Sequence, residues 1–437
     1  MKFLLFLRAY IQAKFYFFLS KNFYGLFKKI QEKKLNSHLE YIVKNSEYYK
    51  EILEGKELKL ENFPIIDKEL MLKEFDKMNT RKLNLEKMTQ KALKAEETRI
   101  FSNKEGDITY GLSSGTSGNR GIFLLDEKES IKWLGAVFAK LGHLRKNFFK
   151  PKRIAFFMRA NSNLYQSVGG FYFKFKFFDI FRNFDYNVKE LNDFKPTIII
   201  GQPSILKLLA EYSIKNDKKY PLIETMTIAE TLEKNVEDFI TNTFKVPNYN
   251  IYQATEGFIA CTYGDHLIHI NEDLVYIEKE YIDKEKTRFT PIITDLNRKV
   301  QPFIRYRLND ILVENKQNLN GFMVIDGIEG RSDEYFEFLN NKSEKTMIFP
   351  DFIRNAVIKV AIDLKDYWVI QEESKKISII LDTNVIENIN LVKESFQKLF
   401  IYYEIEGVEI SVLLEKIVRE KGKKLIRIKR KFVTAQA

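Results

Sequence analysis

Residues 113–121 read Ser113-Ser114-Gly115-Thr116-Ser117-Gly118-Asn119-Arg120-Gly121. Three glycines and four hydroxyl residues stand together here, directly before a strand-like run. Glycines let a backbone turn sharply and approach phosphate oxygens closely. Hydroxyl and amide groups donate hydrogen bonds to such oxygens, and an arginine adds positive charge. The stretch therefore predicts a phosphate-binding loop.

Two better-known phosphate loops do not fit this stretch. No Gly-Lys-Ser/Thr sequence follows it, so it is not a Walker loop. Its glycine spacing differs from the dinucleotide fingerprint, and no strand leads straight into it. Taken alone, the stretch leaves a Ser/Gly-rich linker as the alternative.

Strand-like and helix-like segments alternate along the chain on the C-terminal side of this loop. We predict strands at residues 122–125, 153–158, 197–200, 224–229 and 249–252, and helices from Asp126, from Gln202 and over residues 232–244. Asp126 with Glu129 is a capping box, and Pro203 suits a first helical turn. The alternation predicts an α/β fold with a helix-covered sheet. Because ligands bind beyond the carboxyl ends of such strands, we expect the chemistry in those loops.

The segments on either side of this region differ in character. The first 100 residues are predicted to be mostly helical. Strands dominate residues 262–330, where Asn318-Leu319-Asn320-Gly321 predicts a hairpin turn. From about residue 335 a small α+β domain is expected, with strands at 367–370 and 377–381 and a helix near 390–400.

Three further clusters carry groups suited to nucleotide chemistry. Tyr252-Gln253-Ala254-Thr255-Glu256-Gly257 follows a strand, and its adjacent hydroxyl and carboxylate can hold a phosphate oxygen and Mg²⁺. Arg305-Tyr306-Arg307-Leu308-Asn309-Asp310 ends in an acid that can accept both ribose hydroxyls. Gly330-Arg331-Ser332-Asp333-Glu334 lies at the expected domain boundary. Each cluster alone is equally typical of a turn, a cap or a linker.

The order of these elements resembles the acyl-adenylate-forming superfamily, within it the branch of phenylacetate–coenzyme A ligase and its capsule-biosynthesis relatives. The resemblance runs from about residue 40 to 430 and rests on six elements in sequence. They are the Ser/Gly/Thr loop, Ala229-Glu230, Tyr252-x-x-Thr255-Glu256, Arg305-Tyr306-Arg307-x-x-Asp310, Gly330-Arg331-Ser332-Asp333-Glu334 and Gly422-Lys423. It implies a large multi-sheet adenylating body over residues 1–331 and a small C-terminal lid domain over residues 332–437.

The resemblance also implies a role for each matched position. ATP-binding residues would be Ser113, Ser114, Gly115, Thr116, Ser117, Gly118, Ala229, Glu230, Tyr252, Asp310 and Arg331, with the loop on the β and γ phosphates, Ala229, Glu230 and Tyr252 around adenine, and Asp310 on the ribose. Thr255, Glu256 and Lys423 would be catalytic: Thr255 on the α-phosphate, Glu256 on Mg²⁺, and Lys423 inserted toward the α-phosphate. Asp333 would form the hinge.

The implied reaction is MgATP-dependent adenylation of a carboxylic acid, followed by transfer of the acyl group to a thiol. Coenzyme A is the expected acceptor, with a carrier-protein thiol as the alternative partner. Two further alternatives are AMP transfer to a non-acid acceptor and a non-catalytic nucleotide-binding protein of an envelope or capsule pathway. Asn119-Arg120, Leu308-Asn309, Glu334 and the absence of glycine from residues 335–347 depart from the family pattern. These departures bear most on the thioester-forming half-reaction.

Charge and cysteine usage limit the other classes of protein. The net charge is +11, and residues 416–431 carry nine Lys/Arg against the single acid Glu420. This tail lacks the interleaved aromatic residues of nucleic-acid binders, so no nucleic-acid partner is expected. The single cysteine, Cys261, fits a reducing cytoplasm. With His266 and His269 it falls one ligand short of a structural zinc site, so packed residues are the preferred interpretation.

The N-terminal segment is rich in aromatic and aliphatic residues, but Arg8, Lys14 and Lys21 interrupt it. No uninterrupted apolar run approaches the roughly 20 residues that span a bilayer. We therefore expect an amphipathic helix that packs on the body or makes a peripheral membrane contact. The acid substrate is not specified, although Phe157, Tyr165 and Phe171 would suit an aromatic or other apolar acid.

Overall fold

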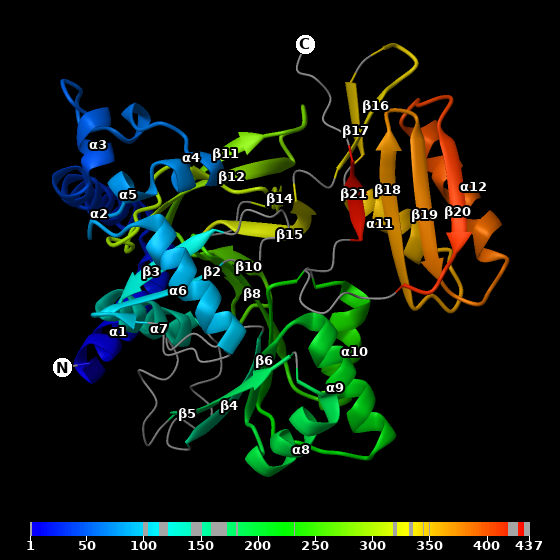
Figure 1. Cartoon of the computed structure of the whole chain (residues 1–437), viewed down its shortest axis with the longest axis horizontal. Helices are drawn as coiled ribbons and strands as arrows, with labels where there is room; N and C mark the ends of the chain where they lie inside the picture. Colours follow the sequence, from blue (N-terminus) through cyan, green and yellow to red (C-terminus); the bar gives the residue numbers. More distant parts are fainter. Residues whose placement is uncertain are drawn as a thin grey trace. The chain divides into compact units, whose positions relative to one another are not determined.

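The computed structural model describes residues 2–98, 104–112, 121–140, 151–158, 173–180, 182–230, 232–317, 321–331, 335–343, 345–348, 350–417 and 427–431. The chain divides into two compact units, one of Met1–Leu308 with Val313–Gly327 and the other of Asn309–Leu312 with Ile328–Ala437 (Figure 1). The division passes through β14 and β15, so both strands contribute to each unit. The predicted boundary after residue 331 stays a prediction.

The helices of the larger unit lie mostly in its first half, as predicted. They are α1 (Lys2–Asn22), α2 (Tyr24–Asn45), α3 (Glu47–Ile52), the 3-10 turn at Leu60–Asn62, α4 (Lys68–Lys73), α5 (Phe75–Met78), α6 (Leu85–Thr98), α7 (Glu127–Lys140), α8 (Phe184–Phe194), α9 (Pro203–Lys215) and α10 (Lys234–Phe244). Asp126 and Glu129 form the predicted capping box, because each carboxylate accepts the other's backbone N–H, at 2.7 and 2.9 Å. Pro203 takes the predicted place in the first turn of α9.

The strands from β1 to β15 form two sheets. They are β1 (Lys104–Glu105), β2 (Ile108–Leu112), β3 (Ile122–Asp126), β4 (Lys152–Met158), β5 (Phe173–Asp179), β6 (Ile198–Gly201), β7 (Glu224–Ile228), β8 (Asn248–Ala254), β9 (Gly257–Thr262), β10 (Ile268–Ile270), β11 (Val275–Tyr281), β12 (Arg288–Asp295), β13 (Tyr306–Arg307), β14 (Asp310–Glu314) and β15 (Val324–Arg331). β1, β2 and β3 form a small antiparallel sheet. The others form a sheet in the order β11-β12-β14-β15-β10-β9-β8-β7-β6-β4-β5, with β13 beside β12. The predicted α/β fold is confirmed; three residues of the predicted hairpin turn lie outside the described residues.

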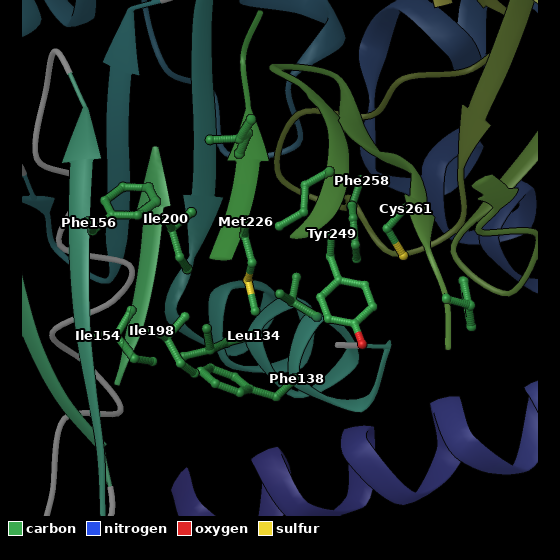
Figure 2. Close-up of a cluster of buried hydrophobic side chains, with 14 of the residues drawn as sticks. Leu134, Phe138, Ile154, Phe156, Ile198, Ile200, Met226, Tyr249, Phe258 and Cys261 are labelled. Carbon is green, nitrogen blue, oxygen red and sulfur yellow. The ribbon is translucent and has the colours of Figure 1, made fainter. Parts of the chain in front are cut away.

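Helices cover both faces of the parallel part of this sheet. Successive strand residues point to opposite faces, so each strand contributes side chains to two cores. On one face, α7 packs over β4, β6, β7 and β8 through Leu134, Phe138, Ile154, Phe156, Ile198, Ile200, Met226 and Tyr249, all buried (Figure 2). On the other, Phe157 stacks on Phe178 at 4.7 Å within a cluster that includes residues of α8, α9 and α10. Phe157 is 1% exposed, so the prediction that it favours an apolar substrate is wrong: it packs in the core. Tyr165 and Phe171 lie outside the described residues.

α1 packs closely on α7. Gly135 of α7 permits this, since a Cβ there would stand 2.6 Å from the Phe6 carbonyl oxygen and 2.8 Å from the Ala9 Cβ. Phe6 also meets Phe138 edge to face, with ring centroids 6.0 Å apart. In the described part of the chain, α1 is the one helix long and apolar enough to cross a membrane by length and composition. The helix continues through Arg8 and Lys14, so it is longer than any uninterrupted apolar run in the sequence.

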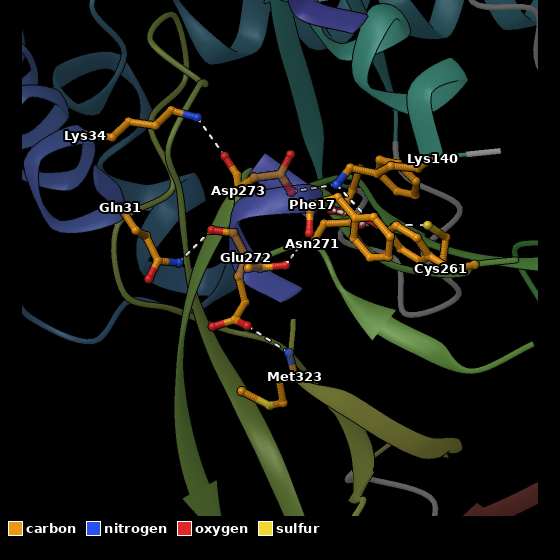
Figure 3. Close-up of polar contacts among 12 residues, drawn as sticks. Phe17, Gln31, Lys34, Lys140, Cys261, Asn271, Glu272, Asp273 and Met323 are labelled. Carbon is orange, nitrogen blue, oxygen red and sulfur yellow. Dashed lines mark hydrogen bonds and ion pairs between the residues drawn. The ribbon is translucent and has the colours of Figure 1, made fainter. Parts of the chain in front are cut away.

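A buried polar network ties the N-terminal helices to the sheet (Figure 3). The Lys140 ammonium lies 2.6 Å from the Asp273 carboxylate, and both side chains are almost fully buried. Lys140 also donates to the Tyr263 hydroxyl at 2.9 Å. From α2, Lys34 donates to the Asp273 carbonyl at 2.7 Å and Gln31 to the Glu272 carbonyl at 2.6 Å. The network therefore fixes α2, the end of α7 and the 271–273 segment together.

The smaller unit is an α+β domain, as predicted. Its elements are β16 (Phe336–Leu339), β17 (Lys345–Ile348), α11 (Pro350–Ile358), β18 (Asp366–Glu373), β19 (Lys376–Asp382), α12 (Asn388–Tyr402), β20 (Glu409–Leu414) and β21 (Ile428–Arg430). Its main sheet has the order β20-β19-β18-β21. β21 belongs to the basic tail, and its neighbourhood is internally paired: Arg427 with Asp366, Arg430 with Glu337 and Lys431 with Glu372. These pairs reduce the charge that the tail offers to a polyanion.

Candidate active site

Three neighbouring parallel strands end at one edge of the large sheet. The register pairs Gly201 with Thr227 between β6 and β7, and Ile228 with Ile251 between β7 and β8. Gln202 and Ala229 therefore follow neighbouring strand ends, and Tyr252 lies beside them where β8 runs on to pair with β9. The carboxyl edge of parallel strands is where α/β sheets bind ligands. The structure thus brings Ala229, Glu230 and Tyr252 to the expected place.

The Ala229-Glu230 segment turns sharply away from β7. Ala229 has φ +69°, which is unusual for a residue with a side chain, and its side chain is exposed. The Glu230 carboxylate accepts the Ser204 backbone N–H at 3.3 Å, in the first turn of α9. A carboxylate at a helix N-terminus is favoured by the helix dipole. This contact connects the loops that follow β6 and β7.

Thr255 and Glu256 form a two-residue turn between β8 and β9. Ala254 and Gly257 are paired across the turn, and both turn side chains are half-buried. A Cβ on Gly257 would come within 3.0 Å of an Asp295 carboxylate oxygen. Glycine therefore lets the end of β12 lie against the start of β9. The predicted catalytic pair is held on a rigid hairpin rather than on a long loop.

A segment that the sequence analysis did not single out, residues 295–303, links this hairpin to β3. The Gln301 side chain accepts the Leu124 N–H at 2.9 Å and donates to the Ile122 carbonyl at 3.0 Å. Arg298 donates to the carbonyls of Leu124, at 3.3 Å, and Thr255. β3 follows the Ser/Gly loop directly in sequence. The 295–303 segment therefore joins the strand after that loop to the Thr255-Glu256 turn.

Arg298 is the buried cation of this link. Asp295 accepts its backbone N–H at 3.0 Å, and the Glu129 carboxylate accepts the N–H of Val300 at 3.0 Å. Burial lowers the pKa of Arg298, while Asp295, Glu129 and Glu256 favour its charged form. Burial also raises the pKa values of Glu129 and Asp295. A fixed guanidinium beside Glu256 therefore keeps a positive charge at the turn.

The other predicted site residues fall into two groups. Ser113, Ser114, Gly115, Thr116, Ser117, Gly118, Asp333 and Lys423 lie outside the described residues, as does the side chain of Arg331 at the end of β15. Asp310 begins β14 and is grouped with the smaller unit. The residues that the structure brings together in the larger unit are Ala229, Glu230, Tyr252, Thr255 and Glu256.

Few of the described side chains could coordinate a metal ion at this site. The described residues contain no group of three or more His, Cys, Asp or Glu side chains arranged to hold a metal ion. Glu256 alone fits Mg²⁺ held largely by substrate phosphates, which is how Mg²⁺ commonly binds beside nucleotides. Cys261 is fully buried, and burial raises its thiol pKa to about 12, which disfavours a zinc thiolate. His269 is likewise buried, with its Nε2 3.0 Å from Asp265.

Replacing Arg298 by methionine is expected to lower the free energy of unfolding by about 3–5 kcal/mol, because Asp295 and Glu129 lose their buried counter-charge. Arg298→Lys should recover only part of this stability, because a single ammonium group cannot donate to both carbonyls that the planar guanidinium reaches. Denaturant unfolding measures both. As a control, Arg81→Met removes an exposed pair with Asp107 and should cost no more than about 1 kcal/mol. Equal losses for Arg298→Met and Arg81→Met would refute the anchoring role.

Solved structures give the fold its class. No family model matches the chain. A 2-hydroxyisobutyryl-CoA ligase in complex with its acyl-AMP superposes with a TM-score of 0.65 at 15% identity, over 92% of this chain and 89% of that chain. ATP-bound MatB from Rhodopseudomonas palustris superposes with a TM-score of 0.51 at 11% identity, over 74% and 66%. The chain has the fold of the acyl-adenylate-forming superfamily.

One sequence relative shares a higher identity with this chain than the structures just described. Protein CapK of Staphylococcus aureus is 26% identical over 381 residues, which are 80% of this chain and 80% of that protein. The fold that the motif resemblance implies is thus confirmed, and CapK is a relative of this chain over most of its length.

Proposed function

We propose that the chain is an adenylate-forming ligase that uses MgATP to activate a carboxylic acid and then passes the acyl group to a thiol. One observation carries this proposal. Ala229, Tyr252 and the Thr255-Glu256 turn lie at the carboxyl edge of the parallel strands, where α/β sheets bind ligands. The neighbours whose names mention acyl-AMP, ATP and CoA support the choice of substrates.

In the first half-reaction, a carboxylate oxygen of the acid attacks the α-phosphorus of ATP. The bond from that phosphorus to the bridging oxygen breaks, and pyrophosphate leaves. This chemistry needs alignment and charge neutralisation more than covalent help. Tyr252 and the Ala229-Glu230 segment would border the adenine, and the Thr255 hydroxyl would donate to an α-phosphate oxygen.

The charges at the turn suit this role. Mg²⁺ would supply Lewis-acid neutralisation of the phosphate oxygens, with Glu256 as its protein ligand. Arg298 would hold the backbone of the turn and place a positive charge beside Glu256. Ser113–Gly118 would bind the β and γ phosphates. Asp310 would bind the ribose, with Arg331 nearby. Lys423 would stabilise the negative charge that develops at the α-phosphate.

In the second half-reaction, a thiol sulfur attacks the acyl carbon and AMP leaves. Coenzyme A is the proposed acceptor, since ligases with this fold are named for it. The subtype we propose is the phenylacetate–CoA ligase-like, capsule-biosynthesis branch, because of the motif order and the CapK relative. The proposed location is the cytoplasm, where ATP and coenzyme A are supplied.

Lys423→Ala should reduce acid-dependent pyrophosphate release by at least about 100-fold, because a cation that stabilises the transition state is lost. ATP binding should remain, since the phosphate loop and adenine residues are untouched. Stopped-flow pyrophosphate release and equilibrium ATP binding separate the two effects. Lys416→Ala, in the same basic tail, is the matched control. If Lys423→Ala released pyrophosphate within threefold of the wild-type rate, a difference of about 0.65 kcal/mol in activation free energy, Lys423 would not have that role.

A further inference from the structure

The outer face of α1 carries a continuous apolar stripe. Its members are Phe3 (69% exposed), Leu4 (68%), Leu7 (38%), Ile11 (57%), Phe15 (51%) and Phe18 (53%). Their spacing of three and four residues places them along one side of the helix. The stripe continues past the end of the helix in Phe23, Tyr24 and Leu26, which are 45–56% exposed.

This stripe is not the face by which α1 packs on the protein. Phe6, Ala9, Ala13 and Leu19 are the buried apolar residues of the helix. A helix that packs on a body needs only one apolar face. Scattered exposed hydrophobic residues are normal, but nine of the twenty large ones exposed in the described chain fall within residues 3–26. The outer face therefore has an apolar surface that the fold does not use.

The charges that α1 itself carries have one sign. α1 contains Lys2, Arg8, Lys14 and Lys21 and no acidic residue. Helical geometry places Arg8 along one flank of the stripe and Lys14 and Lys21 along the other. Lys2 and Lys21 pair with Glu127 and Asp265 of the body, while Arg8 is solvent-exposed. Long basic side chains beside an apolar face can extend to anionic headgroups.

We propose that α1 binds an anionic membrane surface, lying parallel to it with the stripe inserted at the headgroup level. Aromatic and leucine side chains on one face with basic residues beside them are the features of an interfacial helix. A second copy of the chain fits less well: a symmetric α1–α1 contact would bring these basic flanks together with no acid on either helix. The inner face would stay on α7, so the helix lies on the membrane without crossing it.

Vesicle co-sedimentation of the full chain tests this proposal. We expect binding to phosphatidylcholine vesicles that contain phosphatidylglycerol, at least about tenfold weaker binding to phosphatidylcholine alone, and weakening by high salt. Phe15→Gln/Phe18→Gln should reduce binding at least about tenfold, because two rings no longer insert. Ile401→Gln/Tyr402→Gln, which alters side chains 75% and 76% exposed on α12, is the matched control and should bind as wild type.

Two results would overturn the proposal. One is wild-type protein that stays in the supernatant with anionic vesicles. The other is a Phe15/Phe18 variant that sediments as wild type does. Light scattering of the free protein separates the second-copy alternative: a dimer that the Phe15/Phe18 variant dissociates, without vesicle binding, would assign the stripe to self-association.

Discussion

Glu256→Gln is expected to lower acid-dependent pyrophosphate release by at least about 100-fold, because the turn loses the one charge that we assign to Mg²⁺. Glutamine keeps the size and hydrogen-bonding capacity of the side chain. The hairpin itself is fixed by the pairing of Ala254 with Gly257 and by Arg298 on the Thr255 carbonyl. The loss should therefore arise without unfolding, and the Mg²⁺ concentration needed for half-maximal rate should rise.

The measurement is a pyrophosphate-release assay across a Mg²⁺ titration, with the thermal midpoint recorded for each protein. Glu211→Gln on α9 is the control, since Glu211 is exposed and its contact with Lys207 is 4.0 Å long. That variant should match wild type. Glu256→Gln with an unchanged Mg²⁺ requirement and near-normal release would show that Glu256 does not serve the metal.

Lys140→Met is expected to lower the free energy of unfolding by about 3–5 kcal/mol, since it leaves a buried Asp273 carboxylate without its closest cation. Lys140 and Asp273 are 2.6 Å apart, with side chains 2% and 1% exposed. The double variant Lys140→Met/Asp273→Leu should recover most of the loss, because an apolar pair carries no uncompensated charge. Denaturant unfolding followed by near-ultraviolet circular dichroism measures both.

The matched control is Lys207→Met, which breaks an exposed contact with Glu211 on α9. It should change stability by no more than about 1 kcal/mol. If Lys140→Met were no more destabilising than this control, the polar network would not be what holds α2, α7 and the 271–273 segment together. If the double variant were worse than the single one, the hydrogen bonds of Asp273 would outweigh its charge.

Sequence patterns predicted the parallel part of the sheet well, because local signals coincide there. β-Branched runs such as Ile198–Ile200 are buried on both faces, and Asp126 with Glu129 caps α7 as the capping-box pattern requires. Ala229 and Thr255-Glu256 directly follow β7 and β8, and Tyr252 lies near the end of β8, so their places at the carboxyl edge of the sheet follow from the strand pattern. Once a strand is placed in the sheet, the position of the residue at its end is fixed as well.

Arg298 and Gln301 could not be found in this way. Asp295-Leu296-Asn297-Arg298 has the composition of an ordinary surface turn. Its function depends on contacts with Leu124 and Thr255, which are more than a hundred residues and about forty residues away in the chain. Phe157 was misassigned for a related reason: the sequence shows that a strand residue is apolar, but which face covers it depends on helices elsewhere.

Acid-dependent exchange of labelled pyrophosphate into ATP tests the central claim most directly. We predict that at least one carboxylic acid supports exchange without any thiol, that Mg²⁺ is required, and that Lys423→Ala and Glu256→Gln abolish it. Addition of coenzyme A should then convert the exchange into net release of AMP. A protein that binds ATP but shows no exchange with any acid, or that transfers labelled AMP to a non-acid acceptor, would contradict the assignment.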